Sequence, residues 1–213
     1  MAKNNGAAVL FDLDGVVIDS IWSIWMATRD LLEEAGVPFA RLPDFRSFLS
    51  SFSMPGHHYY RNYGVMASFE ELARRFLQII PLYEAIVEPY SGMPQTIETL
   101  RSRGVRTAIV SAGNPERVEQ KLARFGLRGL FDAVYADPAG KTASIKDCCA
   151  QFNCAPQRTF FVGDLQSDMR DGRAAGVISL GFVADYPFMV PVLTRAGAAV
   201  CFREPAELLK LVF

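Results

Sequence analysis

Residues 11–15 read Phe-Asp-Leu-Asp-Gly and directly follow an apolar run, Ala7 to Leu10, that predicts a buried strand. Residues two apart in an extended chain point to the same side, so Asp12 and Asp14 can face one common site. Two carboxylates held so close repel each other unless a cation lies between them or one of them carries a proton. The stretch therefore indicates a metal, a proton, or both, although polar residues capping a turn would also explain five residues taken alone.

The pattern of the chain changes near residue 89. Residues 20–88 show only helical patterns, whereas helices alternate with short β-rich runs from Tyr90 onward. Such alternation is typical of a parallel sheet covered by helices on both faces. Because the first strand needs the later ones to form a sheet, we predict an α/β, Rossmann-like core of residues 1–19 plus 89–213. Residues 20–88 are predicted to be an inserted, all-helical cap.

Individual elements follow from hydrophobic spacing and from Gly and Pro stop signals. In the cap, helices are predicted to begin at Ser20, Phe45 and Ser68, and a polar-aromatic loop surrounds residues 54–58. The predicted strands of the core after the first are 105–110, 133–136, 159–162, 178–183 and 198–202. Its predicted helices are 94–103, 115–125, 143–152, 168–175 and one that starts at residue 205.

Composition narrows the class of protein. The chain has 213 residues, half of them hydrophobic, and a formal net charge of −1, which fits one globular core with an insertion and no nucleic-acid partner. No apolar run could span a bilayer or serve as a signal peptide, and none of the four cysteines forms a C-x-x-C pair. We therefore expect a cytoplasmic monomer or homodimer with free thiols and no membrane partner.

Polar residues come directly after the predicted strands of the core. In an open parallel sheet, ligands bind at the carboxyl ends of the strands, so these residues are expected to converge on one crevice. A hydroxyl, an ammonium and several carboxylates together suit an anion and a divalent cation. The residues concerned are Asp12, Asp14, Ser111, Lys141, Asp164 and Asp168.

Each of these residues also has a structural explanation. Lys141 alone could be a solvated loop lysine, and Asp168 could cap its own helix. Ser111 could be a helix cap, but Asn114 followed by Pro115 already supplies the preferred pair at a helix start. Asp164, which follows a buried strand and a glycine, is harder to explain structurally. The joint occurrence of these residues favours a functional site.

In their order along the chain these motifs resemble those of the haloacid dehalogenase (HAD) superfamily of hydrolases. The resemblance is to the subgroup with a helical (C1) cap after the first strand, and to phosphatases similar to phosphoglycolate phosphatase. Two positions depart from the usual pattern: Ala112 stands where Asn is common, and Thr142 stands where Pro is common. The second departure bears on the position of Lys141. The matching residues are 12–20, Ser111, Lys141, 163–168 and 173–176.

The resemblance implies a two-step phosphoryl transfer to water from a small phosphorylated metabolite. Asp12 would attack phosphorus and form an aspartyl-phosphate, and Asp14 would serve as general acid and base. Mg²⁺ would be held by Asp12, Asp164 and the backbone carbonyl of Asp14, with Asp168 as a further ligand or as support. The phosphate would be bound by Ser111, Lys141 and the backbone amides around Leu13 and Ala112.

Other activities remain open from the sequence. Dehalogenases of this superfamily lack an acid at the Asp14 position, and related sugar phosphomutases carry a histidine where this chain has Ile24. We therefore prefer a hydrolase to a β-phosphoglucomutase-like enzyme, and we keep as a third hypothesis a low-turnover phosphate-binding regulatory protein. Within the cap, His57, His58 and Arg61 are the candidates for substrate contact.

Overall fold

The computed structural model describes residues 6–138 and 140–213. The chain divides into two compact units. One consists of the residues up to Ile18 together with Pro89–Phe213, and the other is Asp19–Glu88. The second unit begins one residue earlier than the segment 20–88 expected from the sequence.

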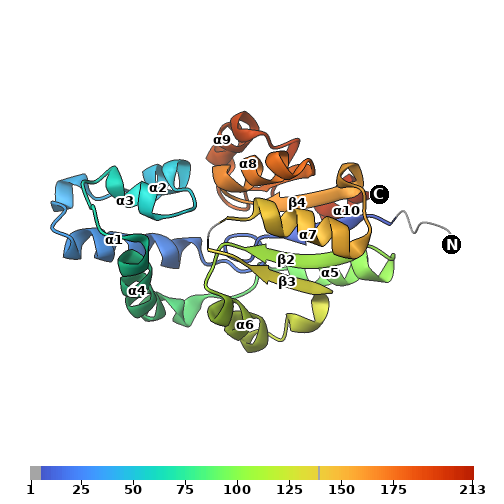
Figure 1. The fold of residues 1–213 in the computed structure, drawn as a ribbon, viewed down its shortest axis with the longest axis horizontal. Coiled ribbons are helices and arrows are strands. Elements are labelled where there is room, and N and C mark those ends of the chain that lie inside the picture. Colours follow the sequence, from blue (N-terminus) through green and yellow to red (C-terminus); the bar gives the residue numbers. More distant parts are fainter. Residues whose placement is uncertain (1–5, 139) are drawn as a thin grey trace. The chain divides into compact units, whose positions relative to one another are not determined.

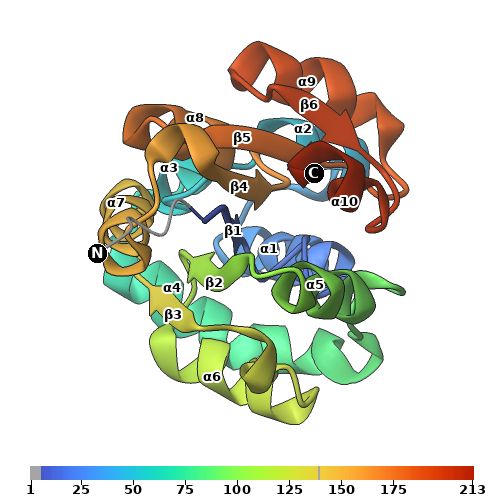
Figure 2. The same cartoon turned by 90° about the vertical axis from the view of Figure 1, so that its right-hand side faces the viewer.

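The first unit is built on a six-stranded sheet in which every pair of neighbouring strands is parallel. The strand order is β3-β2-β1-β4-β5-β6, so the first strand of the chain lies inside the sheet (Figure 2). This topology confirms the predicted α/β, Rossmann-like core. The strands are β1 (Ala8–Phe11), β2 (Arg106–Ser111), β3 (Ala133–Ala136), β4 (Thr159–Gly163), β5 (Ile178–Phe182) and β6 (Val200–Phe202).

Strand β1 lies in the interior of the sheet and ends directly before Asp12. Its four residues are fully buried, as expected of a strand covered on both faces. It pairs with β2 on one side and with β4 on the other, where Phe11 lies opposite Ile109 and Val162. The Asp12 amide extends the ladder by one bond to the Val162 carbonyl, at 2.9 Å. Asp12 therefore occupies the carboxyl end of a strand that is held from both sides.

Helices cover the sheet. Contacts link α7 to α8 and α8 to α9, and a separate set links α5 to α10 (Figures 1 and 2). The sequence analysis did not predict α9, a short helix that carries Pro191 in its first turn and follows a 3₁₀ turn, Pro187–Met189. The helices of this unit are α5 (Met93–Ser102), α6 (Pro115–Arg124), α7 (Thr142–Phe152), α8 (Gln166–Ala175), α9 (Val190–Ala196) and α10 (Glu207–Val212).

The second unit is helical throughout its regular elements. Its helices are α1 (Ile21–Glu34), α2 (Phe45–Ser51), α3 (His57–Arg61) and α4 (Phe69–Ile79), with two 3₁₀ segments, η1 (Phe39–Arg41) and η2 (Ile80–Ile86). Ser68 accepts a bond from the Glu71 amide and caps α4 as expected. The placement of His57 and His58 in a loop was wrong, because both lie on α3. This short helix is stabilised by Tyr59, whose ring packs edge-on against Phe48 and Phe52.

Helix hydrophobicity and the state of the cysteines bear on where the protein can reside. Within the part of the chain that is described, no helix combines the length and the apolarity that a membrane crossing requires. The four cysteines are free thiols, and three of them are buried.

Candidate active site

The carboxylate of Asp12 is fixed at the end of β1. Only 5% of the residue is exposed, and its Oδ1 accepts a 2.7 Å bond from the amide of Leu13. Leu13 and the following residues form a tight turn, in which Gly15 adopts a φ of 80° that favours glycine. The amide that was expected to bind phosphate thus has Asp12 as its partner in this structure.

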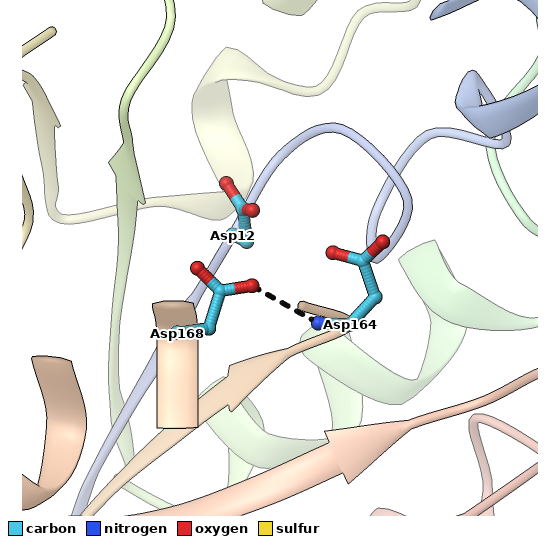
Figure 3. A group of neighbouring side chains, drawn as sticks. All are labelled: Asp12, Asp164 and Asp168. Carbon is cyan, nitrogen blue, oxygen red and sulfur yellow. Dashed lines mark hydrogen bonds between the residues drawn. The ribbon is translucent and has the colours of Figure 1, made fainter. Parts of the chain in front are cut away.

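Three buried carboxylates converge beside β1. Ligand oxygens of Asp12, Asp164 and Asp168 all lie within 4.8 Å of one another, and Figure 3 shows their side chains extending into a common region. Asp12 follows β1, Asp164 follows β4 and Asp168 lies in the first turn of α8. The neighbouring strands β1 and β4 therefore bring together acids that are about 150 residues apart in the chain.

Asp168 has two structural tasks. Its Oδ2 accepts bonds from the amides of Asp164, at 3.2 Å, and Leu165, at 2.9 Å, and so caps α8 (Figure 3). Its Oδ1 accepts a 2.6 Å bond from Lys141. A Cβ atom on Gly163 would lie 2.3 Å from the Cβ of Asp168, so only glycine permits this approach. Asp168 is thus both a helix cap and a member of the acidic cluster.

Lys141 is the cation of the cluster. Its Nζ lies 2.6 Å from Asp12 Oδ2 and 2.6 Å from Asp168 Oδ1, and the side chain is only 2% exposed. Lys141 is the residue just before α7, and it follows the loop that leaves β3. The structure thus places Lys141 in the site, whereas the exposed Lys146 lies on the surface of α7.

Burial dominates the electrostatics of these groups. It raises the pKa of Asp12 to about 7, while Lys141 lowers it and Asp168 raises it further. Burial, followed by Asp168 and Asp12, holds the pKa of Asp164 well above its ordinary value. Burial opposes the charged form of Lys141, but Asp12 and Asp168 outweigh it and raise the pKa of this lysine. Three buried carboxylates thus share one lysine, and a further cation would stabilise their ionised forms.

The donor set fits a hard divalent cation. All three groups offer carboxylate oxygens, which Mg²⁺ prefers. The Oδ1 of Asp164 is buried without a hydrogen-bond partner among the described residues, and buried polar atoms are normally satisfied. A cation bound to this oxygen would supply the interaction that the protein itself does not.

Ser111 lies at the end of β2, next to β1 in the sheet. It is 3% exposed, and its Oγ accepts a 3.0 Å bond from the amide of Gly113. The hydroxyl proton can still be donated to a ligand. Asn114 caps α6 by accepting from the Arg117 amide, so Ser111 is not the helix cap. Ala112, the other residue expected to bind phosphate in this loop, follows Ser111 directly and is buried.

Asp14 has a partner that the sequence analysis missed. Its Oδ1 lies 2.6 Å from the Nζ of Lys121 on α6, and it does not belong to the three gathered acids. Asp14 is also close enough to Asp12 to raise the pKa of that carboxyl. Asp14 and Lys121 are 107 positions apart, and no local spacing signals such a pair.

Comparison with known proteins places this site in a family. The sequence profile of the haloacid dehalogenase-like hydrolases matches residues 9–182. The chain belongs to this family. The match includes Asp12, Ser111, Lys141 and Asp164, and it confirms the resemblance drawn from the motifs.

Curated relatives of this haloacid dehalogenase-like hydrolase are phosphoglycolate phosphatases. The protein of Haemophilus influenzae (strain 86-028NP) is 30% identical over 58% of this chain and 57% of its own length. That of Pseudomonas syringae pv. tomato is 26% identical over 90% of this chain and 75% of its own length. The match to the Haemophilus relative thus spans less than two thirds of that protein.

Solved structures share the fold of this haloacid dehalogenase-like hydrolase. A conserved haloacid dehalogenase-like protein of unknown function from Agrobacterium tumefaciens superposes with a TM-score of 0.80 at 23% identity, covering 97% of each chain. A HAD family hydrolase from Deinococcus radiodurans, solved with bound phosphate and sodium, gives a TM-score of 0.70 at 24% identity, covering 96% of this chain and 93% of that one.

Thr142, which stands where proline is common in this family, links two helices of the core. Thr142 is the first residue of α7, and its hydroxyl donates a 2.6 Å bond to Asp171 on α8. Proline at this position could not make that bond. The bond joins α7, which Lys141 directly precedes, to α8, which carries Asp168, and Lys141 contacts both Asp12 and Asp168.

The residues expected to contact substrate lie together on α3 of the helical unit. The rings of His57 and His58 are 4.0 Å apart, and Arg61 is exposed at the end of the helix. Burial, followed by the charges of His58 and Arg61, lowers the pKa of His57. Their contact with substrate stays a prediction.

Proposed function

We propose that this protein is a Mg²⁺-dependent phosphomonoester hydrolase that works through an aspartyl-phosphate. The observation that carries the proposal is the contact of Lys141 with Asp12 and Asp168, beside Asp164, at the carboxyl ends of β1 and β4. In this proposal Asp12 is the nucleophile, Lys141 is the cation and Asp164 is a metal ligand. A phosphoryl-transfer site needs these groups close to one another.

The chemistry proposed has two steps. The Asp12 carboxylate attacks phosphorus, the bond to the leaving oxygen breaks, and Asp14 gives that oxygen a proton. Asp14 then takes a proton from water, which attacks the aspartyl-phosphate and releases inorganic phosphate. Splitting one displacement into two makes each easier, and general acid-base help of this kind is worth about 10²- to 10⁴-fold.

The negative charge of the phosphate is compensated by side chains and amides of the protein and by Mg²⁺. Lys141 and the Ser111 hydroxyl would bind the phosphoryl oxygens, together with the amide of Ala112. Mg²⁺, when bound, would supply positive charge between the carboxylates and the phosphate dianion. We assign Asp12, Asp164 and the backbone carbonyl of Asp14 to hold it. Asp168, whose two oxygens already accept protein bonds, would orient its neighbours.

The substrate proposed is a small phosphorylated metabolite, with 2-phosphoglycolate as the first candidate. The names of the curated relatives support this choice, as does the phosphate bound by the Deinococcus radiodurans hydrolase. Ile24 stands where related mutases carry histidine, which favours hydrolysis over isomerisation. We place substrate selection in the helical unit, with His57, His58 and Arg61 as its candidates. Free thiols support a place in the cytoplasm.

A hydrolysis screen tests this proposal. We expect the purified protein to release phosphate from p-nitrophenyl phosphate and from at least one of 2-phosphoglycolate, sugar phosphates and nucleoside monophosphates. EDTA should abolish the release and excess Mg²⁺ should restore it. Isomerisation of β-glucose 1-phosphate without net hydrolysis would point to a mutase. Binding of Mg²⁺ and orthophosphate without turnover of any compound would point to a regulatory protein.

The acidic cluster also predicts how stability depends on pH. Because the pKa of Asp12 is raised to about 7 and that of Asp164 is raised as well, the folded protein binds protons that the unfolded chain has released. This contribution to stability is complete below the unfolded pKa values and is lost as the pH rises through the folded ones. We expect metal-free protein to lose about 1 to 3 kcal/mol of unfolding free energy between about pH 5 and pH 8.

Urea unfolding at several pH values measures this effect. His57, whose pKa is lowered, acts in the opposite direction, so the informative quantity is the difference between wild type and Asp12→Asn. That variant should show a smaller loss because it lacks one raised carboxyl group. Saturating Mg²⁺ should flatten the wild-type profile by stabilising the ionised cluster. Identical profiles for wild type and Asp12→Asn in the absence of metal would contradict the assignment.

A further inference from the structure

Lys121 is not among the residues to which the proposed mechanism assigns a role. It lies in the C-terminal half of α6, the helix that starts directly after the Ser111 loop. Its Nζ donates a 2.6 Å bond to Asp14 Oδ1, while Lys141 binds Asp12 at the same distance. Each of the two acids of the first motif therefore has its own lysine, delivered by a different segment of the chain.

The ion pair is not an ordinary surface contact. The side chains of Lys121 and Asp14 are only 14% and 25% exposed, whereas pairs of flexible, exposed side chains contribute little. Lys121 follows Val118 by one helical turn and directly precedes Leu122. These two residues are 2% and 0% exposed and anchor α6 in the core. The position of the ammonium is thus set by a helix that is itself packed in place.

The backbone of the turn does not depend on this pair. The amides of Val17 and Ile18 donate to the Leu13 carbonyl at 3.0 and 2.9 Å, and the amide of Gly15 donates to the Ile18 carbonyl at 2.8 Å. These bonds close the turn on either side of Asp14. What Lys121 adds is therefore a fixed direction for the Asp14 side chain.

We propose that Lys121 is a positioning residue for Asp14, and that it sets how well the enzyme expels leaving groups that need a proton. This inference rests on the proposed function, in which Asp14 protonates the leaving oxygen. Positioning matters because a general acid must lie within hydrogen-bond reach of the oxygen it protonates. Without this ion pair the Asp14 carboxylate would lose the ammonium bound to its Oδ1, and it would point at that oxygen in a smaller share of molecules.

Two aryl phosphates of similar size separate this role from a general loss of structure. Phenolate is a strong base that leaves poorly without a proton, because phenol ionises near the tyrosine value of about 10. In p-nitrophenolate the nitro group delocalises the charge, so the group leaves without help. Loss of Asp14 positioning should therefore slow hydrolysis of phenyl phosphate much more than hydrolysis of p-nitrophenyl phosphate.

The experiment compares kcat/KM for both esters, with Mg²⁺, in wild type and three variants. We expect Lys121→Met to lower the value for phenyl phosphate about tenfold or more and the value for p-nitrophenyl phosphate about twofold or less. Lys121→Arg, which keeps the charge, should recover most of the loss. Lys146→Met is the matched control, because Lys146 is exposed on α7, and it should match wild type on both esters.

A double variant tests whether Lys121 acts through Asp14. Adding Lys121→Met to Asp14→Asn should cause no further loss on phenyl phosphate, because the group to be positioned is already gone. Equal losses on the two esters, no loss on either, or additive effects in the double variant would overturn the inference while leaving the hydrolase proposal in place. A wild type that hydrolyses neither ester would instead overturn the proposed function, and this inference with it.

Discussion

Replacement of Asp12 by asparagine should reduce hydrolysis of p-nitrophenyl phosphate by about 10⁴-fold or more, because an amide cannot form the aspartyl-phosphate. The fold should survive the change. The amide oxygen can still accept the bond that Leu13 donates to Asp12 Oδ1, and Lys141 keeps its 2.6 Å contact with Asp168. Replacing a buried carboxylate whose pKa is raised to about 7 also removes a desolvation cost.

Three measurements make this result specific. Steady-state hydrolysis gives the loss of activity, and circular dichroism with urea unfolding shows that the variant is folded. Mass spectrometry of acid-quenched reactions should detect a phosphorylated enzyme for wild type and none for Asp12→Asn. Asp147→Asn is the control, since Asp147 is an exposed carboxylate on α7. Wild-type turnover by Asp12→Asn would refute the nucleophile assignment.

The second large effect is expected for Lys141→Met, which should damage both stability and activity. The change removes the ammonium from between Asp12 and Asp168, which are 5% and 0% exposed. Removing one partner of a buried ion pair costs about 3 to 5 kcal/mol, because it leaves an uncompensated charge. Removing one donor that stabilises transition-state charge costs about 10²- to 10³-fold in rate.

The effect of Mg²⁺ separates the loss of stability from the loss of activity in Lys141→Met. Mg²⁺ can replace the missing positive charge between the carboxylates, so it should restore part of the unfolding free energy of Lys141→Met. It should not restore kcat/KM, because the ammonium that we propose binds the phosphoryl oxygens is still missing. Urea unfolding with and without Mg²⁺, beside hydrolysis assays, measures both quantities, and Lys146→Met on α7 is the control. If Lys141→Met matched that control in both assays, Lys141 would have no role in the site.

The strands and their polar ends could be predicted because their signals are local. The run before Asp12 and the run before Gly163-Asp164 are apolar, short and followed by an acid, and a parallel sheet places such ends at one edge. The family match over residues 9–182 includes both of these runs. Four of the side chains expected at this edge, those of Asp12, Lys141, Asp164 and Asp168, lie together in the structure.

The contacts that sequence reasoning missed depend on packing between distant segments. Lys121 looks like any charged residue of an amphipathic helix, and only the placement of α6 brings it to Asp14. The double task of Asp168 is hidden in the same way, since it depends on the close approach of Gly163. Helix α3 was missed because burial of Tyr59 and Tyr60, instead of a periodic pattern, stabilises it.

The central position of β1 constrains the order in which the protein can assemble. Residues 8–11 are translated before both strands that flank them in the sheet, and the second of these strands, β4, is translated well after β2. Such non-local pairing slows folding because a long loop must close first. Asp12 is thus translated before the other acids of its cluster, but the strand that flanks β1 on its second side becomes available only once residues 159–162 have been made.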